Sequence, residues 1–468
     1  MYIVILSIFI ILKQREGIFM DTKDQAAVSK NETDQLNGDA NKEIWPIGKK
    51  AAFFTLALSC AFCILDFCDR QVLASLFPYL KKDMGFSDSQ LGLLVSIVNM
   101  SIAVFTVPAG YLIDRWSRKY MLGIMTFFWS LATGACAFVG TYTHLLICRF
   151  FIGTGEAGYV PAAQSLISAS FPKKMRATAL SIFITSISFG GPLGIVTGAF
   201  IAQHWGWRHA FGVVAIPGLI AAFLCIFLKD FKVKKVEEHA KAAAQETVVK
   251  TEPWVKVILS VLKTPSCLIT FFALAGHNMF ASVLVNWSIS YFHREAGMDP
   301  TTASLLSTTI WIGLAAGHII TGAIIDYLRK KKGCPTAITF VIICTLACFF
   351  MEFAAFSYVR PGSALQATLF AAGMCCTGSI LPIGYTVTAD LNPPHHRGTA
   401  MGVLTFVQNA LGMAIGPVLA GFLSDTFGLA NSLIALSFLE LFVALCWVAV
   451  RALYNRDLAK VVHTEISF

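Results

Sequence analysis

Charged residues are scarce in this chain of 468 residues: lysine, arginine, aspartate and glutamate together make up 13%, about half the share typical of soluble domains. Hydrophobic residues make up 56%, and phenylalanine alone occurs 38 times. A soluble fold of this size cannot bury so many apolar side chains, which excludes a cytosolic enzyme. Disorder of the whole chain and nucleic-acid binding are excluded too, because disorder needs low hydrophobicity and nucleic-acid recognition needs dense basic surfaces.

The 13 cysteines lack the spacing of a disulfide framework or a metal site. Nearly all of them fall in hydrophobic stretches, where a thiol packs as a small apolar group. No nucleophile–base or metal-ligand spacing indicates an intramembrane enzyme. We therefore expect no enzymatic activity, no metal and no cofactor.

The charges that are present are unevenly placed. Residues 1–50 and 229–263 are two short polar segments that hold 27 of the charged residues. The rest of the chain consists largely of apolar runs of about 20 residues, each long enough to cross a ~30 Å hydrocarbon core as a helix. Twelve such runs predict an all-α integral membrane protein with twelve transmembrane helices in two six-helix halves. They lie near 52–79, 88–113, 119–139, 143–169, 178–202, 207–228, 266–291, 301–326, 336–357, 363–389, 398–424 and 430–453.

This order predicts five parts of the chain. They are a cytoplasmic, disordered N-terminal tail (1–50), an N-terminal half (51–228), a cytoplasmic linker (229–264), a C-terminal half (265–455) and a cytoplasmic C-terminal tail (456–468). Residues 1–19 are apolar at first but too short to span, and they lack a basic start and a cleavage site. We interpret them as an upstream start or an interfacial segment rather than a signal peptide.

Lysine and arginine predict the orientation of the chain, because cytoplasmic loops carry an excess of both. One set of loops is rich in them, with Arg115, Arg118, Lys119, Lys173, Lys174, Arg176, Arg329–Lys332 and Arg397. The other set holds only Lys81, Lys82, Arg208, Arg294 and Arg360. We therefore expect a multi-pass protein of the cell (inner) membrane with both termini and the linker in the cytoplasm. The net charge of +9 is then a topology signal that needs no nucleic-acid partner.

The two halves share sequence patterns in the same order. The loop Gly110–Lys119 (GYLIDRWSRK) has a degenerate copy at Gly322–Lys331 (GAIIDYLRKK). Two further matches follow at slowly growing offsets: Pro172–Ala179 with Pro393–Ala400, and Gly191-Pro192 with Gly416-Pro417. These matches predict a parallel duplication of one six-helix unit, which places a substrate site between the halves near the bilayer midplane.

Five ionisable residues inside the predicted spans are candidates for function, because charge at mid-bilayer is costly. Asp66, Asp69 and Arg70 lie on span one, and Arg149 and Glu156 on span four. Asp66 and Arg70 are four residues apart, and Arg149 and Glu156 are seven apart, so each pair shares a helical face. We expect the charges to pair across the two spans, with Asp66 a weaker candidate than Asp69. The alternative is a neutral cluster that only fixes helix packing.

These residues favour proton coupling to an organic anion. A substrate anion that binds Arg70 or Arg149 takes the positive charge away from Asp69 or Glu156, and the freed carboxylate then binds a proton. Substrate binding and proton binding promote each other, and linkage makes the effect reciprocal. Asp69 and Glu156 are therefore the candidates for proton coupling, and Arg70 and Arg149 the candidates for substrate binding.

The C-terminal half offers weaker candidates for the substrate. Among its polar and aromatic groups we favour Tyr291 and Asn409, because a hydroxylated anion needs donors opposite the arginines. Any one of these groups also fits an interhelical hydrogen bond. Glu440 lies in the middle of span twelve, and the sequence offers no role for it.

The Gly110–Lys119 loop resembles the loop signature of the major facilitator superfamily. Its copy at Gly322, the segment around Arg149 and the Gly191-Pro192 pair belong to the same pattern, and the resemblance covers about residues 50–455. It implies that Asp114 and Arg118 latch the cytoplasmic ends of neighbouring helices in the outward-facing state. The cytoplasmic gate residues are then Gly110, Asp114, Arg118 and Asp326. The plainer interpretation is that these charges only orient the chain.

Two families within this group are similar at the buried charges. Asp69-Arg70, with the Arg149–Ala157 segment (RFFIGTGEA), resembles the anion:cation symporters that take up sugar acids, and also the Spinster-like family associated with lysolipids and sphingolipids. Both resemblances imply roles in proton coupling and anion binding for these positions. Gly158-Tyr159 and Ser170 depart from the sugar-acid pattern. The Gly155–Tyr159 run (GEAGY) leans towards the Spinster-like family and related bacterial carriers.

Together these observations predict a proton-coupled symporter of a small organic anion such as a sugar acid, which works by alternating access. Its partners are the anion, the proton and the lipid bilayer, and we expect a monomer. One alternative is a Spinster-like exporter of a lysolipid or amphipathic drug, which needs an apolar lateral opening. A second is a receptor or sensor that has lost transport, against which the latch loop and the coupling charges argue.

Overall fold

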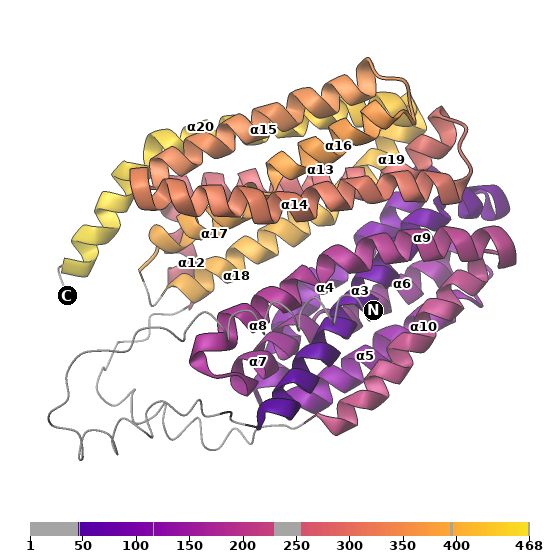
Figure 1. Ribbon diagram of the computed structural model, residues 1–468, viewed down its shortest axis with the longest axis horizontal. Helices are drawn as coiled ribbons and strands as arrows, with labels where there is room; N and C mark the ends of the chain where they lie inside the picture. The colour runs from indigo at the N-terminus through magenta and orange to yellow at the C-terminus, as the bar shows by residue number, and fades with distance from the viewer. Residues whose placement is uncertain (1–44, 46, 116, 229–253, 394–395, 467–468) are drawn as a thin grey trace, which may run out of the picture. The chain divides into compact units, whose positions relative to one another are not determined.

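The computed structural model describes residue 45 and residues 47–115, 117–228, 254–393 and 396–466. The chain divides into two units, Met1–Trp45 and Pro46–Phe468, and the fold described below is that of the second. The predicted N-terminal tail and most of the predicted linker lie outside the described residues. Both six-helix halves belong to the second unit (Figure 1).

The N-terminal half is built from helices joined by short loops over its described residues (Figure 1). Gly85 ends its first helix with the positive φ of 69° that favours glycine, while Ser117 and Thr141 accept hydrogen bonds at the starts of the third and fourth. The helices are α3 (Lys49–Met84), α4 (Asp88–Arg115), α5 (Arg118–Cys136), α6 (Tyr142–Glu156), α7 (Tyr159–Ser170), α8 (Lys173–Thr185), α9 (Ile187–Trp205), α10 (Trp207–Leu224) and the 3-10 turn η1 (Cys225–Phe227).

The C-terminal half is built in the same way and begins with a short helix, α12 (Trp254–Lys263), inside the predicted linker. Its last helix runs on to Ile466, so the described part of the predicted C-terminal tail continues a transmembrane helix. The elements are α13 (Pro265–Glu295), α14 (Pro300–Lys332), α15 (Cys334–Ser357), α16 (Ala364–Thr377), α17 (Ile380–Asp390), α18 (Arg397–Val407), the π-helical turn η2 (Gln408–Met413), α19 (Ile415–Phe427) and α20 (Leu429–Ile466).

Ten helical segments in the described residues are long and apolar enough to cross a membrane. The predicted third and fourth spans, which are α5 and the pair α6–α7, complete the twelve. Large hydrophobic side chains such as Phe223, Ile312 and Ile319 are exposed, as lipid-facing side chains must be. The all-α membrane architecture predicted from the sequence is confirmed.

Four spans are interrupted, and the interruptions repeat between the halves. Span four breaks at Gly158 and span ten at Gly378, and these glycines are 220 residues apart, close to the offset of the sequence repeat. Span five breaks at Ser186, and span eleven has its π-helical turn at Gln408–Met413. A Cβ at Gly158 would lie 2.4 Å from the Met125 side chain, so the break also allows close helix packing. The duplication therefore appears in the backbone as well as in the sequence.

The two halves contact each other along α4–α19, α9–α14 and α3–α13. Small residues permit the approach: a Cβ at Gly92 would lie 2.2 Å from the carbonyl oxygen of Pro417. The Trp287 indole N–H donates to that same oxygen at 3.1 Å, and its ring packs against Phe77 across the interface. These contacts fix the first and seventh spans, α3 and α13, at the interface between the halves.

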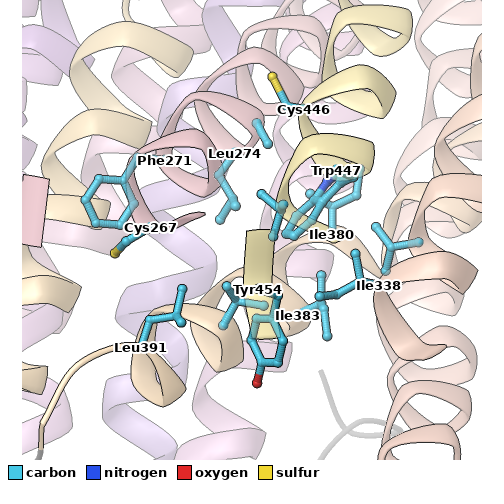
Figure 2. Close-up of a cluster of buried hydrophobic side chains, with 14 of the residues drawn as sticks. Cys267, Phe271, Leu274, Ile338, Ile380, Ile383, Leu391, Cys446, Trp447 and Tyr454 are labelled. Carbon is cyan, nitrogen blue, oxygen red and sulfur yellow. The ribbon is translucent and has the colours of Figure 1, made fainter. Parts of the chain in front are cut away.

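The C-terminal half has its own hydrophobic core (Figure 2). Trp447 of α20 lies near Ile380 of α17, while Leu274 and Phe271 approach from α13. All four side chains are buried, and together they hold α20 against the rest of the half.

Candidate functional site

The five charges predicted inside spans one and four lie within the N-terminal half. Asp66, Asp69 and Arg70 come from α3, and Arg149 and Glu156 from α6. Four of them are buried, and the Arg70 side chain keeps 17% of its surface exposed. We call these five residues the N-terminal cluster.

Arg70 joins the two helices of the N-terminal cluster. Its Nε lies 3.0 Å from Oε2 of Glu156, and its Nη2 lies 3.3 Å from Oδ1 of Asp66. The Tyr159 hydroxyl donates to the other oxygen of Asp66 at 2.9 Å. One guanidinium therefore neutralises two buried carboxylates, one on its own helix and one across the packing interface.

Asp69 and Arg149 have a different environment. The Thr133 hydroxyl of α5 donates to Oδ2 of Asp69 at 2.5 Å. The Arg149 guanidinium lies over the Phe211 ring, 5.2 Å from its centroid. Its Nε and Nη2 are buried, and among the described residues neither has a hydrogen-bond partner.

The structure brings together what the sequence placed on two spans, and it adds two supporting residues. Asp66, which we ranked below Asp69, is fully buried and forms the ion pair with Arg70. Tyr159 and Thr133 support the two aspartates and were not predicted. Tyr159 follows directly after the break at Gly158, and that position in the sequence is the signal that could have indicated it.

The two predicted substrate residues of the C-terminal half lie apart from the N-terminal cluster. Tyr291 is buried, its hydroxyl accepts a hydrogen bond from Nε2 of Gln366 at 3.0 Å, and its ring packs on Phe356. Asn409 is half-buried in the π-helical turn and donates to the Thr405 carbonyl at 2.9 Å. Tyr291 is thus part of the core of its own half, whereas Asn409 lies in an irregular turn that contacts α4 and α13.

The predicted gate residues lie near the ends of α4, α5 and α14. Gly110 is helical with open space beside it, and the side chains of Asp114 and Arg118 lie outside the described residues. Asp326 is exposed on α14. At this end of α14, Arg329 forms an ion pair with Asp390 of α17 at 3.5 Å, and the sequence did not indicate Asp390.

At the other end of the helices, charges hold the two halves together. Asp88 at the start of α4 accepts from Arg294 of α13 at 2.6 and 2.7 Å and from the Ser424 hydroxyl of α19 at 2.5 Å. Asp425 of α19 accepts from the backbone N–H of Asp88 at 2.9 Å and of Ser89 at 2.8 Å, at the positive end of α4. We call this set of contacts the interhalf latch, and it was not predicted.

A second group of buried ionisable residues lies inside the C-terminal half. Nδ1 of His277 on α13 lies 2.8 Å from Oε1 of Glu440 on α20, so the glutamate without a role in the sequence has a partner. Glu352 of α15 is fully buried, and among the described residues neither of its carboxyl oxygens has a hydrogen-bond partner. We call His277, Glu352 and Glu440 the C-terminal cluster.

Repeated six-helix halves that bury charged residues inside a membrane-spanning bundle define a membrane transport protein. The family model of the Major Facilitator Superfamily matches residues 59–365 and 278–464. The chain belongs to this superfamily.

Two relatives whose names give a substrate differ in that substrate. The chain is 27% identical to the hexuronate transporter of Bacillus subtilis over 376 residues, which cover 78% of this chain and 86% of that one. It is also 27% identical to the sphingosine-1-phosphate transporter SPNS2 of Xenopus tropicalis over 380 residues, which cover 77% of this chain and 72% of that one.

Solved structures share the fold. A bacterial homologue of the human lysosomal transporter Spinster, in an inward-facing and unoccupied conformation, superimposes with a TM-score of 0.75 at 18% identity over 88% of this chain and 99% of that one. A D-xylose–proton symporter superimposes with a TM-score of 0.64, also at 18% identity, over 86% of this chain and 97% of that one.

Proposed function

We propose that the protein is a proton-coupled symporter of a small organic anion such as a sugar acid. The observation that carries this proposal is the buried guanidinium of Arg149, with two N–H groups that have no partner among the described residues. A buried donor on a cation is costly unless it is hydrogen-bonded, and a carboxylate is the partner that matches a guanidinium in both charge and geometry. Arg149 is therefore the proposed anion site, and Arg70 is its neighbour in the cluster.

The charge balance of the N-terminal cluster favours a proton as the coupled ion. Three carboxylates and two guanidinium groups give a net charge of −1, so one bound proton makes the cluster neutral. A monovalent anion on Arg149 adds one negative charge, which a second proton balances. Asp69 and Glu156 are the proposed proton-binding residues, and Asp66 completes the set. When the cluster is neutral, the change between the two access states costs less free energy, in both the empty and the occupied transporter.

The relatives support both parts of the proposal. The protein named a hexuronate transporter supports a sugar-acid substrate, and the fold is shared with a protein named a D-xylose–proton symporter. Tyr291 and Asn409 remain the proposed contacts from the C-terminal half, of which Asn409 is the better placed because its turn contacts α4.

Alternating access needs two ends that close in turn, and the interhalf latch is the proposed closure at one of them. Asp88, Arg294 and Asp425 join the halves at the end of the molecule that carries few basic loops. The distribution of lysine and arginine indicates that this end faces away from the cytoplasm. By the same rule we place both termini and the linker in the cytoplasm, and the protein in the inner membrane of the cell. The conformation is then inward-facing, with the monomer as the transporting unit.

Gly110, Asp114, Arg118 and Asp326 are the proposed cytoplasmic gate, which closes when the interhalf latch opens. Asp326 is exposed on α14 and lies one turn before Arg329, which pairs with Asp390. An exposed acid next to an existing ion pair is free to exchange partners when the helix ends approach. This arrangement supports a gate at the basic end of the bundle.

A second candidate is a Spinster-like exporter of a lysolipid or amphipathic drug. The relative named a sphingosine-1-phosphate transporter and the structural likeness to a bacterial Spinster homologue favour it. In both candidate functions an anionic group of the substrate binds Arg149. The rest of the substrate is hydroxylated in the first candidate and apolar in the second.

The proposal is tested by uptake into proteoliposomes with an imposed pH gradient, for a panel of sugar acids, aromatic acids and a lysophospholipid. We expect a sugar acid to accumulate only when the gradient is present. Glu156→Gln keeps the shape of the side chain but removes the proton, so accumulation is expected to stop while exchange of substrate across the membrane continues. The control is Glu295→Gln, which changes an exposed glutamate at the end of α13 and should leave uptake unchanged.

Two results would contradict the symport mechanism: accumulation that ignores the gradient, and full accumulation in Glu156→Gln. Transport of the lysophospholipid with no transport of any sugar acid would favour the second candidate.

A further inference from the structure

The C-terminal cluster brings three ionisable side chains from three helices into one buried place. His277 is 2% exposed, and Glu352 and Glu440 are 0% exposed. The His277–Glu440 contact of 2.8 Å joins α13 to α20, two helices that pack along much of their length. This place is separate from the N-terminal cluster, because all three helices belong to the other half.

Glu352 is the member whose surroundings need an explanation. Its two oxygens are buried and have no hydrogen-bond partner among the described residues, and Oε2 of Glu440 is in the same state. The helix that carries Glu352, α15, packs along α20, which carries Glu440. A Cβ at Gly373 of α16 would lie 2.6 Å from Oε1 of Glu352, so the glycine leaves the space that the carboxyl group fills.

The remaining titratable groups around the cluster carry no permanent positive charge. They are His318 of α14, a helix that contacts α13, and the thiols of Cys344, Cys348 and Cys376 on α15 and α16. Among the described residues no lysine or arginine forms an ion pair with Glu352 or Glu440, and no group of three side chains has the geometry of a metal site. Two carboxylates beside one protonated imidazole leave a charge of −1, which burial in an apolar bundle makes costly.

We infer that the C-terminal half contains a second proton-binding site, in which Glu352 carries the proton and the His277–Glu440 ion pair holds it in place. With the proton bound the three residues are neutral together. Without it Glu352 is a buried carboxylate with neither an ion-pair partner nor a donor. The occupant is a proton because the titratable groups around Glu352 are an acid, imidazoles and thiols, and none of them carries a permanent positive charge.

The site is connected to the interface between the halves through α13. His277 faces α20, while its neighbour Asn278 faces the π-helical turn, where a Cβ at Gly412 would lie 2.9 Å from the Asn278 Cβ. The π-helical turn also contacts α4 of the N-terminal half. A change of charge at His277 and Glu352 thus acts on the helix that contacts both halves, and a proton taken up here biases the packing at the interface.

The test is infrared difference spectroscopy of the reconstituted full chain between acidic and neutral pH, where a protonated carboxyl group gives a C=O band that shifts in deuterium oxide. Glu352→Gln is expected to lose one band of a buried carboxylic acid relative to the wild type. His277→Gln is expected to gain one, because Glu440 without its cation must also take a proton. Glu295→Gln on the exposed end of α13 should leave the spectrum of buried acids unchanged.

An unchanged spectrum in Glu352→Gln would overturn the inference, and so would a spectrum of His277→Gln with no additional band. The spectra are recorded without substrate, so this result does not depend on whether the protein transports an organic anion. If His277→Gln fails to fold, Glu352→Gln alone decides, since glutamine keeps the shape of the glutamate.

Discussion

The two halves share one repeat, yet they bury different kinds of charge. The N-terminal cluster sets two guanidinium groups against three carboxylates, and the C-terminal cluster sets one imidazole against two. A guanidinium stays charged at every physiological pH, whereas an imidazole gains and loses its proton near neutrality. The N-terminal cluster therefore keeps positive charge for an anion, while the C-terminal cluster is suited only to proton exchange.

The repeat itself shows where the halves diverged. At the offset of 221 that relates Pro172 to Pro393, Arg149 and Glu156 correspond to Phe370 and Thr377. Phe370 is buried against Phe356 and Phe292, so an aromatic core takes the place of the arginine. The buried ionisable groups of the C-terminal cluster lie instead on α13, α15 and α20. Duplication kept the backbone breaks and changed the chemistry.

Arg149→Gln is the substitution with the largest expected effect on this comparison. It removes the proposed anion site, and charge-assisted hydrogen bonds contribute about 1.5–3 kcal/mol, so sugar-acid affinity should fall about 10- to 100-fold. His277→Gln, which changes the cation of the other cluster, should leave that affinity within about a factor of two. Substrate-induced thermal stabilisation of the purified protein measures both, since a ligand stabilises the folded state according to its affinity.

Arg360→Gln is the control for this experiment, because Arg360 is exposed in a loop between α15 and α16. Equal losses in Arg149→Gln and His277→Gln would remove the distinction between an anion site and a proton site. A loss in the control would mean that net charge, and not the buried position, determines the affinity.

Gly373→Ala has the next largest expected effect and acts on the C-terminal cluster alone. Its new methyl group would meet Oε1 of Glu352 at 2.6 Å, and overpacking of this kind costs about 1–3 kcal/mol. The melting temperature in detergent should therefore fall. Gly402→Ala is the matched control, because a Cβ there meets nothing within 4 Å. In a helix that change should stabilise by about 0.5–1 kcal/mol.

A melting temperature for Gly373→Ala as high as that of Gly402→Ala would contradict the assignment of Gly373 as the space for the Glu352 carboxyl group. Retention of sugar-acid affinity in Gly373→Ala is also expected, since the N-terminal cluster is untouched.

The sequence predicted the twelve spans and the five charges of the N-terminal cluster, because both depend on local signals. Hydrophobic length marks a span, and Asp69-Arg70 or Arg149 with Glu156 stand out as charges in apolar helices. The partners within the cluster depend on how the helices pack. Tyr159 reaches Asp66 only after α3 and α7 pack, which the sequence alone does not specify.

The sequence did not predict the C-terminal cluster or the interhalf latch, because neither has a local pattern. His277, Glu352 and Glu440 are single residues on three separate spans, and only the packing of α13, α15 and α20 brings them together. Asp88 and Asp425 lie 337 residues apart and appear in the sequence as ordinary helix-end acids. Pairings of this kind follow from tertiary contacts, which one sequence without its fold does not specify.

A substitution of an exposed acid outside both clusters is the comparison for the substitutions above. Asp299 is such an acid. Its Oδ2 accepts from the backbone N–H of Thr302 at 2.9 Å and caps the start of α14. The hydrogen bond from the Thr302 side chain and that from its backbone lower the pKa of Asp299. Because the folded-state pKa lies below the unfolded one, its stabilisation is present above the unfolded pKa and is lost as the pH falls through the folded pKa.

Asp299→Ala is therefore expected to have the smallest effect, a loss of at most about 1 kcal/mol at pH 7, further reduced by exposure to solvent. The difference in melting temperature from the wild type should narrow below about pH 4, where the carboxylate takes up a proton. Asp299→Ser keeps a capping oxygen without a charge, so its melting temperature should stay close to the wild type at pH 7. A difference for Asp299→Ala that stays constant with pH would show that the charge of the cap is irrelevant. Any loss of gradient-driven uptake in this variant would mean that acids outside the two clusters also take part in coupling.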